Sequence, residues 1–125
     1  MGTAFLATPE AVEIPDEHKA AIVASDGGDT VFTRAYDIAS GLPWPAGIGE
    51  RVRRDAFTDT WAEREHELRA VRETVTAGSG VLYGQSARFV TAVAPAAEVL
   101  HRISEEAEQL LRRRPADLLS DGVSG

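Results

Sequence analysis

The amino-acid sequence predicts a mostly helical chain with one or two short strands. The main observation is the segment Pro95–Arg113, where apolar residues recur with the period of an amphipathic helix. A second observation is that Thr30–Tyr36 combines β-branched and aromatic residues, as strands do. A third is that glycine and proline divide the rest of the chain into short pieces.

The composition of the chain argues against several classes of protein. The 125 residues suit one small domain, and the chain carries a formal net charge of −7 and no cysteine. The acidic balance argues against a nucleic-acid surface and against docking on an anionic membrane. No apolar stretch approaches the ~20 residues that span a bilayer, and the start of the chain lacks the positive lead of a secretory signal. These features predict a cytoplasmic protein without nucleic-acid or membrane partners.

The opening segment "MGTAFLAT", residues 1–8, places a glycine and a threonine ahead of a short apolar run. We interpret this segment as the last residues of a buried strand that turns over Gly2 into a helix. A further helix is expected from Pro15, because proline suits the first helical position and two acids follow it. This helix runs to Ala24, and the glycines of residues 26–28 end it.

The middle of the chain predicts one strand and one loop. Thr30–Tyr36 should be extended, and we see no segment of similar strength to pair with it. Ser40–Gly49, "SGLPWPAGIG", is predicted as a loop with Trp44 as its aromatic anchor. Because a lone strand leaves its backbone unpaired, the pattern suits pieces of a larger body.

A helix is predicted to start at Thr60, because Thr60 and Glu63 have the spacing of a capping box. Its apolar stripe consists of Trp61, Leu68, Val71 and Val75. The glycines of residues 78–80 break this helix. A short apolar step, Val81–Tyr83, then leads through a glycine turn into a brief helix around Phe89.

The last predicted helix, Pro95–Arg113, has the clearest apolar face of the chain. That face consists of Ala96, Val99, Leu100, Ile103, Ala107, Leu110 and Leu111. The pairs Glu98–Arg102 and Glu108–Arg112 have the four-residue spacing that supports an exposed helix face. Residues 115–125 are expected to form a flexible tail.

Catalytic and metal-binding patterns are absent from the sequence. The histidines, His18, His66 and His101, are far apart and lack metal-ligand spacing. No serine lies in a Gly-x-Ser-x-Gly elbow. The arginine clusters at residues 51–54 and 112–114 are expected to be solvated or paired with some of the twenty acidic residues.

Two glycine motifs are the candidates for a ligand site. Gly2 and Thr3, between a strand and a helix, would expose backbone N–H groups and a hydroxyl that can hold a phosphate. In (β/α)₈ barrels a phosphate lies at the loops after strands seven and eight, beside a helix N-terminus. "YGQS", Tyr83–Ser86, is a glycine-led helix start that could face a ligand. A plain turn remains the alternative for both motifs.

Four parts of the sequence resemble, in order, motifs of the nitronate monooxygenases, formerly called nitropropane dioxygenases. They are Met1–Glu10 with "MGTRFLAT-E", Asp29–Asp37 with "DTVLTRAFD", Arg51–Thr58 with "RVLRN-FT", and Val81–Ser86 with Val93–Val99 for "VYAGQ…V-PAAEVV". The matches extend to about Arg113, so the resemblance covers nearly the whole chain.

The resemblance implies that residues 1–114 are the C-terminal portion of an FMN-binding (β/α)₈ barrel enzyme, comprising the end of barrel strand eight and the closing helices. A whole barrel of this kind runs ~250 residues, so Met1 would be an internal methionine. Two groups of residues match functional positions of the family. They are Gly2 and Thr3 at the FMN phosphate, and Tyr83, Gly84 and Gln85 at the mouth of the active site.

The implied activity is the oxidation of an alkyl nitronate by oxygen to a carbonyl compound and nitrite, with FMN as cofactor. The family's catalytic histidine and its glycine-rich FMN loop lie upstream of Met1, so the resemblance assigns no catalytic residue here. The chain by itself is therefore expected neither to retain FMN nor to be active. Two alternatives stay open: a portion of a related FMN-dependent enoyl reductase, and a free-standing acidic helical interaction module.

Overall fold

The computed structural model describes residues 2–120, with side chains described for residues 2–114. Its elements are α1 (Gly2–Leu6), α2 (Asp16–Ala24), β1 (Thr30–Thr33), α3 (Ala35–Ala39), β2 (Glu50–Arg53), α4 (Ala56–Trp61), α5 (Glu65–Val71), η1 (Arg72–Thr74), η2 (Gln85–Phe89) and α6 (Ala96–Ser120). The expected mostly helical fold with one or two short strands is confirmed. Met1 and the last part of the expected tail, residues 121–125, lie outside the described residues.

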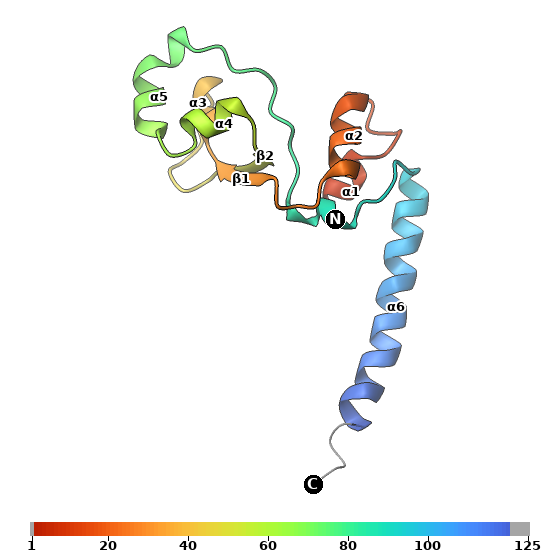
Figure 1. The fold of residues 1–125 in the computed structure, drawn as a ribbon. Coiled ribbons are helices and arrows are strands. Elements are labelled where there is room, and N and C mark those ends of the chain that lie inside the picture. The colour runs from red at the N-terminus through yellow and green to blue at the C-terminus, as the bar shows by residue number, and fades with distance from the viewer. Residues whose placement is uncertain (1, 121–125) are drawn as a thin grey trace.

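The elements gather in two lobes, from one of which α6 extends as a long arm (Figure 1). The first lobe holds α1, α2 and η2 around a cluster of buried apolar residues: Ala7, Ile22, Tyr83, Ala87 and Val90. The second lobe holds β1, β2 and the helices α3–α5, with Ala35, Ile38 and Leu68 at its centre. The two lobes therefore have separate apolar clusters, and within residues 2–120 the only sheet is the two-stranded β1–β2 pair.

The expected strand at the start of the chain is wrong for the described residues, since α1 begins at Gly2 and runs to Leu6. The buried residues Thr3 and Ala7 are four positions apart, which is the spacing of one helix face. A strand would instead have buried every second residue. The apolar run is too short for its period to distinguish the two structures.

The second predicted helix is confirmed as α2, with Pro15 one position before its first helical residue. Asp16 and Glu17 occupy the first turn, where the helix dipole favours negative charge. The chain leaves α2 through Gly27, whose φ of 82° lies in the region that favours glycine.

The predicted strand is shorter than expected, because helix α3 begins at Ala35. The Thr33 hydroxyl ends the strand by accepting a hydrogen bond from the Ala35 N–H at 3.0 Å. The strand also has a partner that the sequence did not suggest, since β1 pairs antiparallel with β2. The sequence of β2, Glu-Arg-Val-Arg, looks polar because only the Val52 side chain is fully buried.

Residues 40–49 form the predicted loop, with positive φ angles at Gly41 and Gly47. The expectation that Trp44 anchors this loop is wrong, because 53% of Trp44 is exposed. The loop is held instead by backbone hydrogen bonds such as that from Leu42 N–H to the Asp37 carbonyl, at 2.9 Å.

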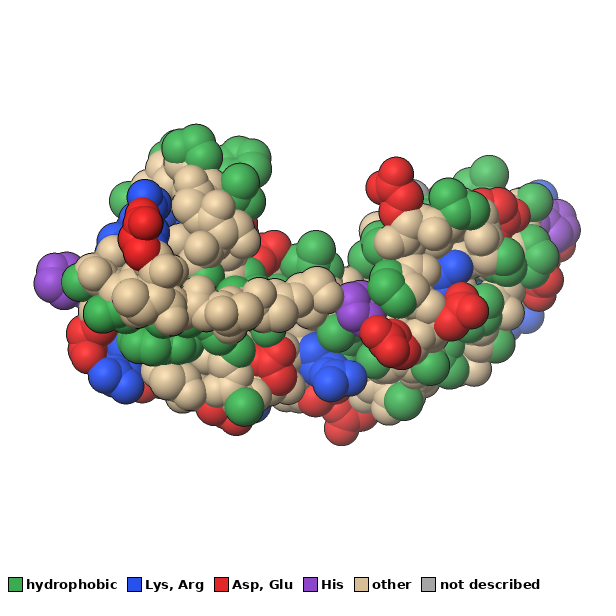
Figure 2. Space-filling view, turned by 90° about the horizontal axis from the view of Figure 1, so that it is seen from above, with side chains coloured by type: hydrophobic (Ala, Val, Ile, Leu, Met, Phe, Trp, Pro, Cys, Tyr) green, Lys and Arg blue, Asp and Glu red, His purple; other side chains and the backbone are tan. Residues whose placement is uncertain are grey.

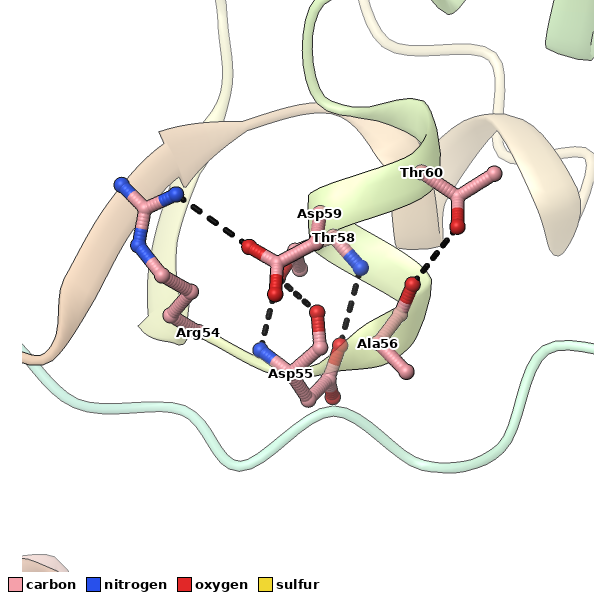
Figure 3. Close-up of polar contacts among 6 residues, drawn as sticks. All are labelled: Arg54, Asp55, Ala56, Thr58, Asp59 and Thr60. Atoms are coloured by element: carbon pink, nitrogen blue, oxygen red, sulfur yellow. Dashed lines mark hydrogen bonds and ion pairs between the residues drawn. The ribbon is translucent and has the colours of Figure 1, made fainter.

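Helix α4 begins at Ala56, four residues before the predicted helix start at Thr60. Its N-cap is Asp55, which accepts the Thr58 N–H at 2.9 Å, while the Asp55 N–H donates to the Thr58 hydroxyl at 2.8 Å (Figure 3). Thr60 lies inside α4 and donates its hydroxyl to the Ala56 carbonyl. The expected capping box of Thr60 and Glu63 is therefore wrong, since threonine rather than Glu or Gln completes the real one.

The predicted apolar stripe is only partly buried. Leu68 of α5 is fully buried, and Trp61 and Val75 pack against its cluster. Val71 is 39% exposed, at the point where α5 ends and η1 begins.

The predicted long helix is confirmed as α6, of 25 residues. The Glu10 carboxylate accepts a hydrogen bond from the Ala96 N–H at 3.0 Å, which caps the start of α6 from the first lobe. Val99 is buried, whereas Leu110 and Leu111 are exposed. The helix continues through Pro115 to Ser120, so residues 115–120 of the expected flexible tail are helical.

Candidate functional site

The two glycine motifs meet in the first lobe. The Gly84 N–H donates to the Thr3 hydroxyl oxygen at 3.2 Å, across 81 positions of sequence. The Ser86 hydroxyl lies 3.5 Å from the same Thr3 oxygen. Thr3 is buried in the first turn of α1, and Gly84 directly precedes η2. The structure therefore brings the start of α1 and the start of η2 together, and we call this contact the α1–η2 junction.

Gly2 leaves the outer side of the α1–η2 junction open. It is exposed, and a Cβ at this position would meet no atom within 4 Å. The first N–H groups of a helix have no acceptor within the helix, so they point outward at this end of α1.

Tyr83 holds the junction to the turn after α2. Its ring is buried in the first cluster, and its hydroxyl donates to the Asp29 carboxylate at 2.6 Å. The Ser25 hydroxyl donates to the other Asp29 oxygen. Tyr83 is thus a connecting residue within the lobe, and its hydroxyl has a fixed acceptor.

These contacts shift the pKa values of both partners. Burial opposes ionisation of Asp29, but the hydrogen bonds from Ser25 and Tyr83 outweigh it and lower the pKa of Asp29 below its ordinary value. Burial, followed by the hydrogen bond to Asp29, raises the pKa of Tyr83 to about 12. The pair is therefore a neutral phenol that donates to a carboxylate over the ordinary pH range.

Gln85 contacts the same turn through its backbone. A Cβ at Gly27 would lie 2.3 Å from the Gln85 carbonyl oxygen, so only glycine permits this approach. Beside it, a shallow hollow of about 320 Å³ is lined by Asp26, Gly27, Gly28, Gln85 and Arg88. Gln85 is thus the one predicted site residue that borders this hollow.

A second groove, of about 270 Å³, lies between the junction and α6. Its lining includes Ala4 of α1, Ser86 of η2, and Arg102 and Glu106 of α6. The groove therefore combines a hydroxyl, a guanidinium and a carboxylate, and its hydroxyl is the Ser86 group that lies next to Thr3.

Five site residues were predicted from the sequence, and the structure places all of them in the first lobe. Thr3 and Gly84 are in direct contact, while Gly2, Tyr83 and Gln85 lie next to them in sequence. Sequence reasoning missed Ser25 and Asp29, which orient Tyr83. Asp29 begins a segment with a family resemblance, but nothing in that pattern indicates a contact with residue 83.

Metal binding has no support in the described part of the chain. Residues 2–114 contain no group of three or more His, Asp or Glu side chains arranged to hold an ion. His66 and His101 are exposed and His18 is half-buried, and His101 lies 3.2 Å from Glu105 on the outside of α6.

No family model, curated protein or solved structure matches this chain. Among residues 2–120, no helix combines the length and the apolar composition that crossing a bilayer requires.

Proposed function

We propose that this chain is the C-terminal portion of an FMN-dependent oxidoreductase of the nitronate monooxygenase type, acting in the cytoplasm on an alkyl nitronate and oxygen. The observation that carries the proposal is the hydrogen bond between Gly84 and Thr3. It joins the two segments whose sequences resemble the phosphate-binding and active-site motifs of that family. Two independent resemblances that meet in space support a common site better than either does alone.

The residues at the junction fit the phosphate end of FMN. Gly2 is open to approach, and the first N–H groups of α1 lack helix acceptors. FMN, when bound, supplies the redox chemistry, while the protein binds and orients it. In this proposal Gly2 and Thr3 hold the phosphate, and Thr3 is itself positioned by Gly84. No residue of this chain is assigned to the chemical step.

The site for the flavin ring would come from the rest of the enzyme. The sheet formed by residues 2–120 has two antiparallel strands, whereas the barrel of the family has eight parallel strands. Large apolar side chains are also exposed in both lobes, including Phe32 and Phe89. Figure 2 shows hydrophobic side chains among the charged ones on one face of the molecule. These side chains are available to pack against further parts of the protein.

Gel filtration of the purified 125-residue chain with FMN, followed by oxygen uptake with propionate nitronate, tests this proposal. We expect no flavin to co-elute and no nitronate-dependent oxygen consumption. A few neutral hydrogen bonds contribute only ~0.5–1.5 kcal/mol each. They do not offset the ~4–15 kcal/mol lost when a ligand is immobilised. Flavin that co-elutes and supports nitronate oxidation would mean that this chain is an enzyme by itself, which would overturn the proposal.

The related FMN-dependent enoyl reductases remain the nearest alternative, because the Gly84–Gln85 pair resembles their ending too. The activity of the whole enzyme distinguishes the two. An enoyl reductase would consume a reduced nicotinamide cofactor with an enoyl substrate, whereas a nitronate monooxygenase would consume oxygen with a nitronate. The interaction-module alternative is favoured by a different observation, the exposed apolar face of α6.

A further inference from the structure

A pocket of about 270 Å³ lies where α1, α2 and residues 79–82 meet, and we call it the α2 pocket. In Figure 1 the segment that contains residues 79–82 runs beside α2, between the two lobes. None of the five predicted site residues lines this pocket. The proposed flavin site therefore leaves the α2 pocket unexplained.

The walls of the α2 pocket are aliphatic. Ile22 of α2 is fully buried, whereas Leu6 and Ile14 are half-buried. An apolar cavity of ~150 Å³ is large enough to hold benzene, and pockets for drug-sized ligands begin at ~300 Å³. The α2 pocket therefore suits a small apolar body about the size of a single ring. The apolar side chains that line it are Leu6, Ile14, Pro15, Ile22 and Leu82.

Three polar side chains complete the lining of the pocket, and each of them can accept a hydrogen bond. They are Glu13, His18 and Ser79. A carboxylate only accepts, while a neutral imidazole and a hydroxyl can accept as well as donate. Among the described residues that line the pocket there is no lysine or arginine. The lining therefore favours a ligand whose polar end donates hydrogen bonds, and it disfavours an anion.

The charges around the pocket favour a positively charged ligand. Residues 2–24 carry four acidic side chains and one basic side chain, Lys19. The ammonium of Lys19 lies 3.9 Å from the Asp16 carboxylate, so Asp16 offsets its charge. Glu13 is the acidic side chain that borders the pocket itself. A protonated amine complements this charge, and its N–H groups match the acceptors of the lining.

We propose that the α2 pocket binds a small aliphatic amine in its protonated form. The ammonium donates to the Glu13 carboxylate, with His18 and Ser79 as further acceptors, and the aliphatic walls hold the apolar body. The α2 pocket shares no lining residue with the proposed phosphate site at Gly2 and Thr3. Amine binding and flavin binding can therefore succeed or fail independently.

Three probes of similar shape and different charge test this proposal: cyclohexylamine, cyclohexanol and cyclohexanecarboxylate. Each is titrated at neutral pH into the isotope-labelled 125-residue chain, and the amide chemical shifts are followed by NMR. We expect the amine to shift the amides of residues 79–82. It should bind about twofold to fivefold more tightly than the alcohol, because exposed ion pairs contribute modestly. The carboxylate should bind most weakly, since Glu13 repels it.

Two variants with the same change of net charge identify the residue responsible. Glu13→Gln removes the acid that lines the pocket, whereas Glu17→Gln removes an acid of α2 that does not line it. Glu13→Gln should abolish the preference for the amine over the alcohol, and Glu17→Gln should retain most of it. Both side chains are exposed, so both variants should keep the fold, which circular dichroism checks.

Three results would overturn the proposal. The first is an amine titration that shifts no amide of residues 79–82, which would mean that the pocket stays empty or that the amine binds elsewhere. The second is an amine that binds no more tightly than the alcohol, which would mean that the pocket does not select a cation. The third is an equal loss of preference in both variants, which would assign the attraction to net charge rather than to Glu13.

Discussion

At the scale of single residues, Thr3 is the side chain that joins the two motifs of the candidate site. We predict that Thr3→Val lowers the free energy of unfolding by about 1–3 kcal/mol, because the Gly84 N–H loses its acceptor in a partly buried place. Thr3→Ser keeps the hydroxyl and should lower the free energy of unfolding by clearly less than Thr3→Val does. Urea unfolding of the two variants measures the difference. Equal losses for valine and serine would contradict the role of the hydroxyl.

The two tyrosines give a second prediction at this scale. Burial and the hydrogen bond to Asp29 raise the pKa of Tyr83 to about 12, and burial and the hydrogen bond to Asp55 raise that of Tyr36 further. In the unfolded chain both ionise near 10.0, so their contribution to stability is complete below pH 10 and is lost as the pH rises toward 12. An ultraviolet titration of the folded protein should show no tyrosinate at pH 10. Half-ionisation of either tyrosine at that pH would contradict the contacts described here.

Asp29 and Asp55 make the stability of the fold depend on pH in the acidic range. Hydrogen bonds outweigh burial for both carboxyls and hold their pKa values below the ordinary 3.8. Their stabilising contribution is therefore present above pH 3.8 and is lost as the pH falls through the lowered values. Asp29→Asn should make stability less dependent on pH in this window, as measured by urea unfolding below pH 5. An unchanged pH dependence would mean that Asp29 is not hydrogen-bonded as described.

At the scale of elements, the structure and the sequence prediction name different N-caps, Asp55 in the structure and Thr60 in the prediction. Asp55→Ala should lower stability by about 1–2 kcal/mol, because it removes the N-cap and also the acceptor of the Tyr36 hydroxyl. Thr60→Ala, at the residue predicted to be the cap, should change stability by less than about 0.5 kcal/mol. Thermal or urea unfolding compares the two. A larger loss of stability for Thr60→Ala than for Asp55→Ala would mean that Thr60 is the N-cap, as the sequence suggested.

The same elements show how far sequence reasoning reaches. The arm of α6 was predicted because a long, strict helical period needs no tertiary context. Strand β2 was missed because a single buried valine among charged residues carries no period. Thr3 and Gly84 were selected as candidates, but their contact depends on how α1 and η2 pack. Asp29 was missed as the partner of Tyr83 for the same reason, since 54 positions separate the two residues.

At the scale of the whole molecule, the two lobes and the arm each present exposed large apolar side chains. Phe89 is 71% exposed and Leu111 is 75% exposed. Contacts with the remainder of a flavin enzyme, as proposed above, would cover this apolar surface.

Isolation of the native polypeptide that contains this sequence tests the central claim most directly. The measurement is its mass together with its flavin content and its oxygen uptake with propionate nitronate. We predict a polypeptide much heavier than 13.4 kDa that releases FMN on denaturation and consumes oxygen with the nitronate. A native polypeptide of 13.4 kDa without flavin would contradict the proposed function.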